Sequence, residues 1–417
     1  VSGKALVFRL LVALALFFWI WLIWTRIYTD KKRINTDKKI SINQLKSALI
    51  SGPNILVVAI ILFFLAQVLV SFFGVDPLYS FFSSMERADG VLQYGFWVLY
   101  FLMIISVFRE KQDWKLFFYV FIIISVVLSV FAWFNYSSQI RLHAIFGNSS
   151  YFAVFLLFSI GFCAIAIERK FISGRLNYLF FFPALFFIIT LIATQTRGVY
   201  LGLTGAVFLF CLLTFLFLRR ESKKLALFSG IFLAVGLISL IALFLAKDTN
   251  FVQNIYILKR ATSVANFWQD DTVRERILVW QMAWKGFKDR PIFGWGPENF
   301  GSAFNKYYDY NVGKIQPWFD RAHSQPIDTL ATGGIVLFSF YIFWLAAAVY
   351  LIFKIAKEKK ILSFILASIF LAYFLQGLFL FDILPTFLGF FPFLAFLVFQ
   401  SYELRIGTNI RMRDEVG

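Results

Sequence analysis

Long apolar runs, each of about 18–28 residues, occupy most of this 417-residue chain. A helix needs about 20 apolar residues to cross the roughly 30 Å hydrocarbon core of a bilayer. Only helices and closed barrels satisfy their backbone hydrogen bonds in lipid, and these runs are too long and too continuously apolar for barrel strands. The pattern therefore predicts an all-α polytopic membrane protein. The 60% content of hydrophobic residues, against about 45–50% in soluble domains, agrees with this.

Eleven of these runs are each long enough for one transmembrane helix. They lie at roughly 6–25, 54–73, 91–108, 115–134, 150–168, 177–194, 198–218, 225–246, 326–353, 361–380 and 384–401. We therefore expect eight transmembrane helices in residues 1–246. A large loop that contains short helices follows at 247–325, and three further helices with a cytoplasmic tail occupy 326–417.

The connectors between the runs alternate in charge along the chain. Segments rich in Lys and Arg, such as 26–46 and 219–224, are expected in the cytoplasm under the positive-inside rule. The alternation then places the large loop outside the cytoplasm. It also places Val1 outside, so we expect either a twelfth helix that precedes Val1 or an N-terminus that is itself outside.

The charge of the chain and its few metal-binding side chains limit the functions to be considered. The net charge of +17 is carried mostly by short connectors, so it indicates membrane topology rather than nucleic-acid binding. Cys163 and Cys211 both fall within apolar runs, and His143 and His323 are the only histidines. We expect no structural disulfide, no metal centre and no cofactor.

The large loop is the only long polar segment, so any chemistry is expected to involve it. Thr272 and Glu275 have the spacing of a capping box, which predicts a helix over about 273–289. Arg276 and Trp280 are four residues apart and share one face of this helix, where they can form a cation–π pair. The alternative is an amphipathic helix that only lies on the bilayer.

A turn and a second short helix are expected after this helix. Gly294 and Gly296 permit a tight turn, and Pro297 suits the first position of a helix that continues to about Tyr307. Glu298 would then either contact a substrate or act as a first-turn carboxylate that interacts with the helix dipole.

The next long helix begins directly after a histidine. Ser324 suits the N-cap position, and Pro326 lies in the first turn. His323 would then lie at the positive end of the helix, where the field disfavours imidazolium and keeps the ring neutral and able to accept a proton. The free N–H groups of the same helix end favour an anion.

Other polar residues share the outer face with the loop. Arg141 and His143 lie in one outer connector, and Arg197 lies in the turn TQTRG. Arginine binds phosphate in bidentate fashion, and a neutral histidine can take a proton from a hydroxyl. The set suits a substrate with a diphosphate leaving group. The alternatives are that Arg197 is an interfacial anchor and that both histidines are structural.

Four segments, taken in order, resemble motifs of the O-antigen ligase superfamily, which also contains O-antigen polymerases and protein O-oligosaccharyltransferases. They are GNSSYFA at 147–153, TQTRG at 194–198, RILVWQMAWKGFKDRPIFGWGPENF at 276–300 and RAHSQPIDTLATGGI at 321–335. The resemblance covers roughly residues 140–350. It implies about twelve transmembrane helices.

The resemblance implies a metal-independent transfer of a glycan from undecaprenyl diphosphate to an acceptor hydroxyl at the outer face of the bacterial cytoplasmic membrane. The acceptor would be a lipid A–core sugar for a ligase and another lipid-linked glycan for a polymerase. Arg197 and Arg276 would bind the diphosphate, and His323 would act as the base or orient the acceptor. Further candidates for substrate binding are Arg274, Arg321, Glu298, Arg141, Asn148 and Trp280.

Three residues depart from the family pattern, namely Ser149, Ser324 and Pro326, and they affect the expected acceptor more than the donor. Two other functions are compatible with the sequence. A small-solute transporter or flippase would carry ionisable residues or broken helices near the bilayer centre. A non-catalytic scaffold for envelope assembly would tolerate substitutions in the loop that do not disturb folding.

Overall fold

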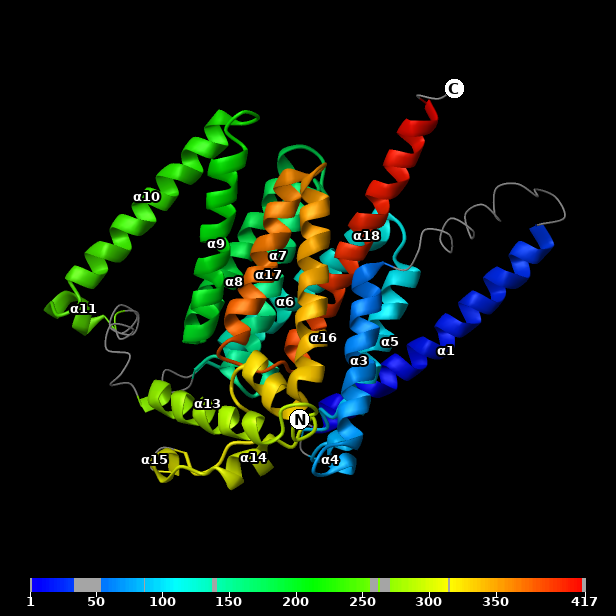
Figure 1. The fold of residues 1–417 in the computed structure, drawn as a ribbon. Helices are drawn as coiled ribbons and strands as arrows, with labels where there is room; N and C mark the ends of the chain where they lie inside the picture. Colours follow the sequence, from blue (N-terminus) through cyan, green and yellow to red (C-terminus); the bar gives the residue numbers. More distant parts are fainter. Residues whose placement is uncertain are drawn as a thin grey trace.

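Helices are the only extended regular elements in the part of the chain that the structure describes. This structure is a computed structural model that describes residues 2–33, 54–85, 87–136, 141–255, 262, 271–313 and 316–414 (Figure 1). Within these described residues, ten helical segments are long and apolar enough to cross a membrane. A further apolar helix, α5 (Val91–Val107), is one residue shorter than the shortest of these ten segments. The predicted all-α polytopic membrane fold is confirmed.

The ten long segments correspond to ten of the eleven predicted apolar runs. They are α1 (Ser2–Arg33), α3 (Ile55–Phe72), α6 (Lys111–Phe134), α7 (Ser149–Glu168), α8 (Phe181–Ala193) with the 3-10 turn before it, α9 (Arg197–Phe217), α10 (Lys223–Leu245), α16 (Gln325–Ala356), α17 (Lys360–Gly377) and α18 (Leu384–Asp414). The remaining predicted run forms α5.

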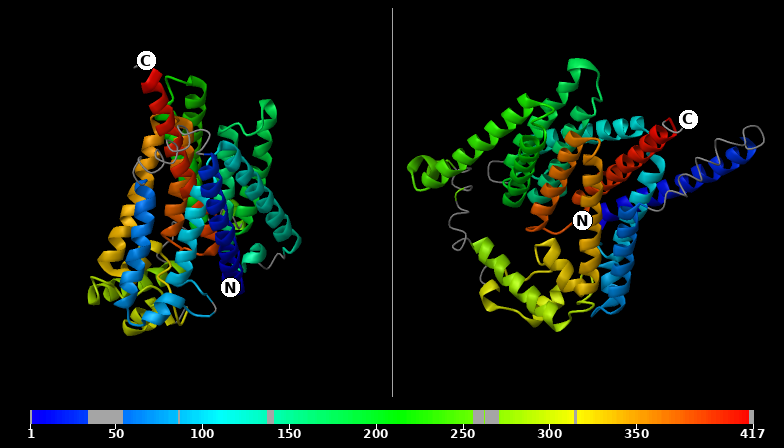
Figure 2. Two further views of the ribbon diagram at one scale, coloured as in Figure 1. Left: turned by 90° about the vertical axis from the view of Figure 1, so that its right-hand side faces the viewer. Right: turned by 45° about the horizontal axis from the view of Figure 1, so that its top comes forward.

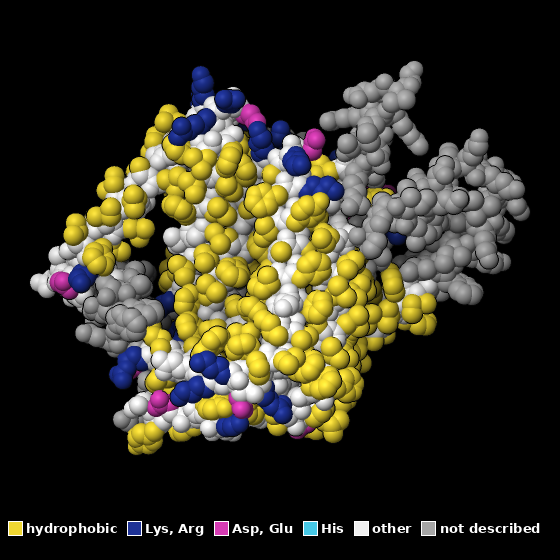
Figure 3. Space-filling model, viewed as in Figure 1, with side chains coloured by type: hydrophobic (Ala, Val, Ile, Leu, Met, Phe, Trp, Pro, Cys, Tyr) yellow, Lys and Arg dark blue, Asp and Glu magenta, His cyan; other side chains and the backbone are white. Residues whose placement is uncertain are grey.

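The helices form a bundle in which α7, α16, α17 and α18 pack near the centre, and α9 packs on α17 (Figure 1). The later parts of α1 and α10 diverge from the bundle, while the start of α10 packs on α9 (Figures 1 and 2). Hydrophobic side chains cover the sides of the helices, while most Lys and Arg side chains lie at the two ends (Figure 3). This distribution is the one that a bilayer requires.

Short helices gather at one end of the bundle, which we call the loop end. They are α4 (Pro77–Phe82), α13 (Asp271–Asp289), α14 (Phe300–Lys306) and α15 (Tyr310–Gly313) (Figure 1). The predicted helix 273–289 is confirmed as α13, although the side chain of Thr272, one half of the expected capping box, lies outside the described residues. The predicted helix that starts at Pro297 was wrong in its start, because α14 begins only at Phe300.

The helix α16 is broken near the loop end. Gly334 has φ 59° and ψ −165°, a conformation that is essentially confined to glycine, so the helix is interrupted there. The break frees backbone groups on both of its sides. The carbonyls of Ala331 and Thr332 and the N–H groups of Ile335 and Val336 all point to partners outside the helix.

The turn that follows α13 pairs with these freed groups. Trp295 N–H donates to Ala331 O at 3.2 Å, and Gly296 N–H donates to Thr332 O at 2.7 Å. On the other side of the break, Ile335 N–H donates to Pro291 O at 2.8 Å. A fourth bond joins the N–H of residue 336 to the carbonyl of residue 292 at 3.2 Å. Backbone pairing therefore docks the loop onto the bundle and places α13 beside the start of α16.

Candidate functional site

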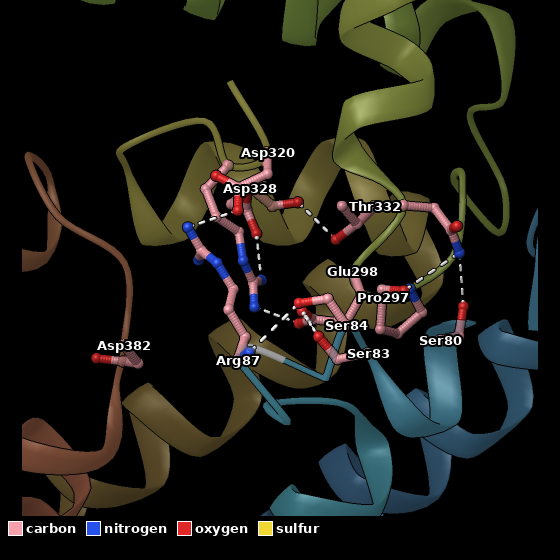
Figure 4. Close-up of polar contacts among 12 residues, drawn as sticks. Ser80, Ser83, Ser84, Arg87, Pro297, Glu298, Asp320, Asp328, Thr332 and Asp382 are labelled. Carbon is pink, nitrogen blue, oxygen red and sulfur yellow. Dashed lines mark hydrogen bonds and ion pairs between the residues drawn. The ribbon is translucent and has the colours of Figure 1, made fainter. Parts of the chain in front are cut away.

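Oppositely charged side chains from three distant segments meet at the loop end (Figure 4). This arginine–carboxylate cluster consists of Arg87, Glu298, Asp320, Arg321 and Asp328. Arg87 pairs with Asp320 at 2.5 Å, and Arg321 pairs with Asp328 at 3.1 Å and with Glu298. The cluster joins the connector before α5, the turn after α13 and the start of α16, so it fixes these three segments relative to one another.

The buried half of the cluster leaves little room for a ligand at Arg321. The side chains of Arg321, Glu298 and Asp328 are 13%, 5% and 3% exposed. Burial alone would lower the pKa of Arg321, but the carboxylates of Glu298 and Asp328 outweigh it and raise the pKa above its usual value. Glu298 also accepts a hydrogen bond from Ser83 Oγ at 2.7 Å. Its φ of 68° places it in a turn, so the expectation of a first-turn helical carboxylate was wrong.

The cluster holds the backbone next to His323. Asp328 accepts a hydrogen bond from the N–H of Ala322 at 2.8 Å through its second carboxylate oxygen. The indole Nε1–H of Trp280, from α13, donates to the carbonyl of Ala322 at 2.9 Å. Side chains thus bind both polar backbone groups of Ala322. His323 follows with φ 51°, a left-handed conformation that is uncommon outside glycine and needs such support.

The ring of His323 lies between two aromatic side chains. Its centre is 5.4 Å from that of Phe319 and 5.4 Å from that of Phe381, and both contacts are edge-to-face. Burial, followed by the charges of Arg276 and Arg87, lowers the pKa of His323 to about 4. The ring is therefore neutral at ordinary pH, as expected. The main cause is burial rather than the helix dipole that the sequence suggested.

Arg276 lies on α13, on the same side as Trp280. Its guanidinium carbon is 5.9 Å from the centre of the Phe379 ring, and Trp280 packs against the same ring at 6.4 Å. The expected sharing of one helix face is confirmed. The effect of Arg276 on the pKa of His323 shows that the cation and the imidazole are close enough to interact. Arg274 is exposed on α13.

A connector that sequence reasoning did not single out forms one wall of the site. Residues 378–383 join α17 to α18, and Leu380 and Asp382 in this connector bond to the backbone and the side chain of Gln325. Phe381 lies 5.2 Å from the guanidinium carbon of Arg87 and 5.5 Å from that of Arg321. The two phenylalanines 379 and 381 therefore line the space between α13 and the start of α16.

The turn with Arg197 lies against the same connector. Arg197 is the first residue of α9, and a Cβ atom at its neighbour Gly198 would lie 3.4 Å from Phe379. Arg141 holds this turn from the other side, because its guanidinium donates to the carbonyls of Thr194 and Gln195, both at 3.0 Å. The turn that carries Arg197 and the guanidinium of Arg276 thus both lie next to Phe379.

Asn148 has a local role in the structure. Its side chain caps α7 by accepting a hydrogen bond from the N–H of Ser150 at 2.8 Å. The His143 ring is bonded through Nδ1 to the carbonyl of Ala144 at 2.8 Å. Neither contact involves the arginine–carboxylate cluster. Ser324 is the N-cap of α16 as expected, with Pro326 in the first turn, but its hydroxyl makes no capping bond.

A cavity of about 90 Å³ leads from the cluster into the bundle. Glu298, Arg321, Asp89 and Asp382 are among its lining residues. Burial and the charge of Glu298 raise the pKa of Asp89 to about 6, and burial raises the pKa of Asp382 to about 7. Both carboxyls lie outside the membrane-spanning helices, and neither was singled out from the sequence.

The groups gathered at the loop end are the two arginine side chains of Arg197 and Arg276, the neutral imidazole of His323 and buried carboxyls. In the described part of the chain, no group of three or more His, Cys, Asp and Glu side chains is placed to hold a metal ion. Such a set is suited to holding an anion through arginine next to a group that can accept a proton.

One comparison with known protein families gives a match to part of the chain. Residues 182–342 match the sequence model of a family described as O-antigen ligase. The matched region runs from α8 through the loop into α16 and contains Arg197, Arg276 and His323. A comparison with curated protein sequences found no match.

Proposed function

We propose that this chain, of which residues 182–342 match a family described as O-antigen ligase, belongs to that superfamily and transfers a glycan from a lipid diphosphate to an acceptor hydroxyl. The superfamily carries out glycan transfer of the ligase and polymerase kind. The finer assignments, which are an undecaprenyl diphosphate donor and the outer face of the bacterial cytoplasmic membrane, rest on the motif resemblance and on the charge of the connectors.

The observation that carries the proposal is the neutral His323 beside Arg276. In the transfer, the acceptor oxygen bonds to the anomeric carbon as the bond from that carbon to the diphosphate oxygen breaks. The hydroxyl proton passes to His323, and the leaving diphosphate gains negative charge, which Arg276 and Arg197 stabilise. The incoming anion also raises the pKa of His323 from its low value in the free protein, so the base becomes stronger when the donor is bound.

Arg321 and Glu298 act as positioning residues in this proposal. Arg321 already has two buried carboxylate partners, and Glu298 is engaged by Arg321 and Ser83. They hold the backbone before His323 rather than bind the substrate. Trp280 has a similar role through its bond to Ala322. Arg141 positions the turn that carries Arg197.

The test is transfer by the purified full-length chain in detergent, with a polyprenyl-diphosphate glycan and candidate acceptors. His323→Ala is expected to lower kcat by about 10²–10⁴-fold, the usual contribution of a general base. His143→Ala is the matched control, because His143 bonds to its own neighbour's backbone, and it should transfer at the normal rate. Undiminished transfer by His323→Ala would refute the mechanism.

The choice of acceptor separates the two activities of the superfamily. A ligase attaches the glycan once to a different acceptor, such as a lipid A–core sugar. A polymerase extends a second lipid-linked glycan and gives a ladder of products. The same assay with both acceptors in separate reactions distinguishes them by the length of the product.

A further inference from the structure

A second cavity lies at the end of the bundle opposite the loop end. It has a volume of about 170 Å³ and is formed by the first turn of α6, the residues after α7 and the later part of α18. The helix α6 begins and α7 ends at this end of the bundle (Figure 1), so the cavity lies at the ends of helices that are long enough to cross a membrane. None of the groups proposed above for glycan transfer lines it.

Two buried hydrogen-bond donors line this cavity without an acceptor. Gln400 and Trp114 are 0% and 1% exposed. Within the described residues, Gln400 Nε2 and Trp114 Nε1 have no hydrogen-bond partner. The amide oxygen of Gln400 accepts from Lys359 at 3.0 Å, and this bond fixes the amide so that its NH₂ group is the unpartnered end. Buried donors are nearly always satisfied, so a bound acceptor is expected here.

The charges around the two donors are positive. The lining includes Lys111, Lys115, Arg169 and Lys170, and no carboxylate is among the described lining residues. Two acids interact with these cations. Glu403 contacts Lys359 at 2.5 Å, Lys111 at 3.0 Å and Arg169 at 3.5 Å, and Glu168 interacts with the charges of Arg169, Lys359 and Lys170. Two carboxylates among five cations leave an excess of positive charge, which favours an anion.

The walls of the cavity are aromatic. Phe171, Phe396 and Phe399 line it together with the ring of Trp114. An apolar wall below a cationic rim matches a phospholipid, whose phosphate is charged and whose glycerol ester and chains are not. A free inorganic phosphate would use the rim alone.

We propose that this cavity binds the phosphate group of an anionic phospholipid, with the N–H groups of Gln400 and Trp114 as donors and the surrounding cations as counter-charges. The bound lipid satisfies both donors and neutralises the excess charge at this end of the bundle. The site is separate from the loop end, so it concerns a membrane lipid and not the glycan donor.

The experiment measures binding of short-chain phosphatidylglycerol, short-chain phosphatidylcholine and sodium phosphate to the purified full-length chain in a neutral detergent. The wild-type chain should bind phosphatidylglycerol at least tenfold more tightly than phosphatidylcholine, whose choline cation is repelled. The affinity for phosphatidylglycerol should be lower at 500 mM than at 50 mM salt, because salt screens the attraction between the lipid phosphate and the cations. Sodium phosphate should bind much more weakly, because it lacks the apolar part.

Two variants test the residues. Lys115→Gln with Lys170→Gln should weaken phosphatidylglycerol binding by about 30-fold, at about fivefold for each cation near a lipid surface. Trp114→Phe keeps an aromatic side chain but removes the N–H donor together with the smaller ring of the indole, and it should weaken binding by about fivefold. The matched control is Lys223→Gln with Lys224→Gln, at the same end of the bundle but outside the cavity, which should bind like the wild type.

Several outcomes would overturn the proposal. Equal binding of the two lipids by the wild-type chain would show that the cavity does not select an anion. Equal binding of phosphatidylglycerol by the cavity variant and its control would show that other residues hold the lipid. Binding of sodium phosphate as tight as that of phosphatidylglycerol would replace the lipid with a free phosphate. The salt dependence of the wild-type chain tests the charge term even if a variant fails to fold.

Discussion

The break in α16 depends on a glycine, and replacing it with alanine tests how the loop is docked. At Gly334 an added Cβ atom would lie inside contact distance of the carbonyl of Ile292 and 2.7 Å from the backbone nitrogen of Gly294. The obstructing atoms are backbone, so they cannot rotate away as a side chain would. Gly334→Ala is therefore expected to push the docked turn off the helix.

The expected cost combines two terms. The conformation of Gly334 costs another residue roughly 1–3 kcal/mol. Each of the four backbone hydrogen bonds across the break contributes about 1 kcal/mol, and about half of them would be lost if the turn shifts. The destabilisation is then about 3–5 kcal/mol. It should also abolish glycan transfer, because α13 carries Arg276 and Trp280.

Two other glycines serve as matched controls. Gly147 has φ 73° but open space around its Cβ position, so Gly147→Ala measures the cost of the backbone conformation alone, about 1–2 kcal/mol. Gly236 has ordinary helical geometry in α10 and nothing within 4 Å, so Gly236→Ala should be neutral or slightly stabilising.

The assay heats the protein in detergent and uses size-exclusion chromatography to find the temperature at which half of it has aggregated, which we take as the melting temperature. One kcal/mol shifts a melting temperature by about 2–4 °C in chains of 150–250 residues and by less in longer ones. Gly334→Ala should therefore fall by several degrees, Gly147→Ala by one or two, and Gly236→Ala by none. A melting temperature for Gly334→Ala equal to that of Gly147→Ala would refute the steric argument.

Three further predictions concern the site. Trp280→Phe removes the bond to Ala322 and should lower kcat by about fivefold to tenfold with little change in stability, since one hydrogen bond is worth about 1 kcal/mol; an unchanged kcat would show that the bond does not position His323. Because the pKa of His323 is low, kcat/KM should be constant above about pH 5 and should fall below pH 4, where the ring becomes protonated. The fall in kcat should begin at higher pH, since the bound anionic donor raises this pKa, and an identical acid limb for kcat and kcat/KM would contradict diphosphate binding near His323. Glu298→Gln leaves Arg321 without one buried carboxylate and should cost about 2–4 kcal/mol, measured as the drop in melting temperature, while Glu298→Gln with Arg321→Met should cost less than the sum of the two single changes; additive costs would show that the ion pair is not coupled.

The transmembrane helices could be predicted from the sequence because the signal for each helix lies within its own residues. A run such as 150–168 contains its own signal, so α7 was expected within one residue. The helix α13 was also local, since its start and its shared face follow from spacing. His323 was placed next to a helix start for the same reason, and its neutral state was expected even though burial, not the dipole, causes it.

The contacts that build the site were not local and were therefore missed. Arg87 and Asp320 are separated by more than 200 residues, and no pattern in either segment identifies the other. Burial raises the pKa values of the Asp89 and Asp382 carboxyls. In the sequence both residues lie in short connectors between apolar runs, and nothing there indicates that they are buried. The break at Gly334 had a visible signal, because two glycines follow each other inside an apolar run, but the partner turn could not be identified.

The docking of the loop through peptide groups has a consequence for how this protein tolerates change. The pairing of backbone hydrogen bonds depends on the number of residues between the paired groups and not on the side chains of those residues. The exposed side chain at Ile292 should therefore accept many replacements without moving the turn. Insertion or deletion of a single residue between 291 and 296 should instead shift every pairing by one position. Scanning this turn by insertion would thus reveal its spacing more sharply than scanning it with alanine.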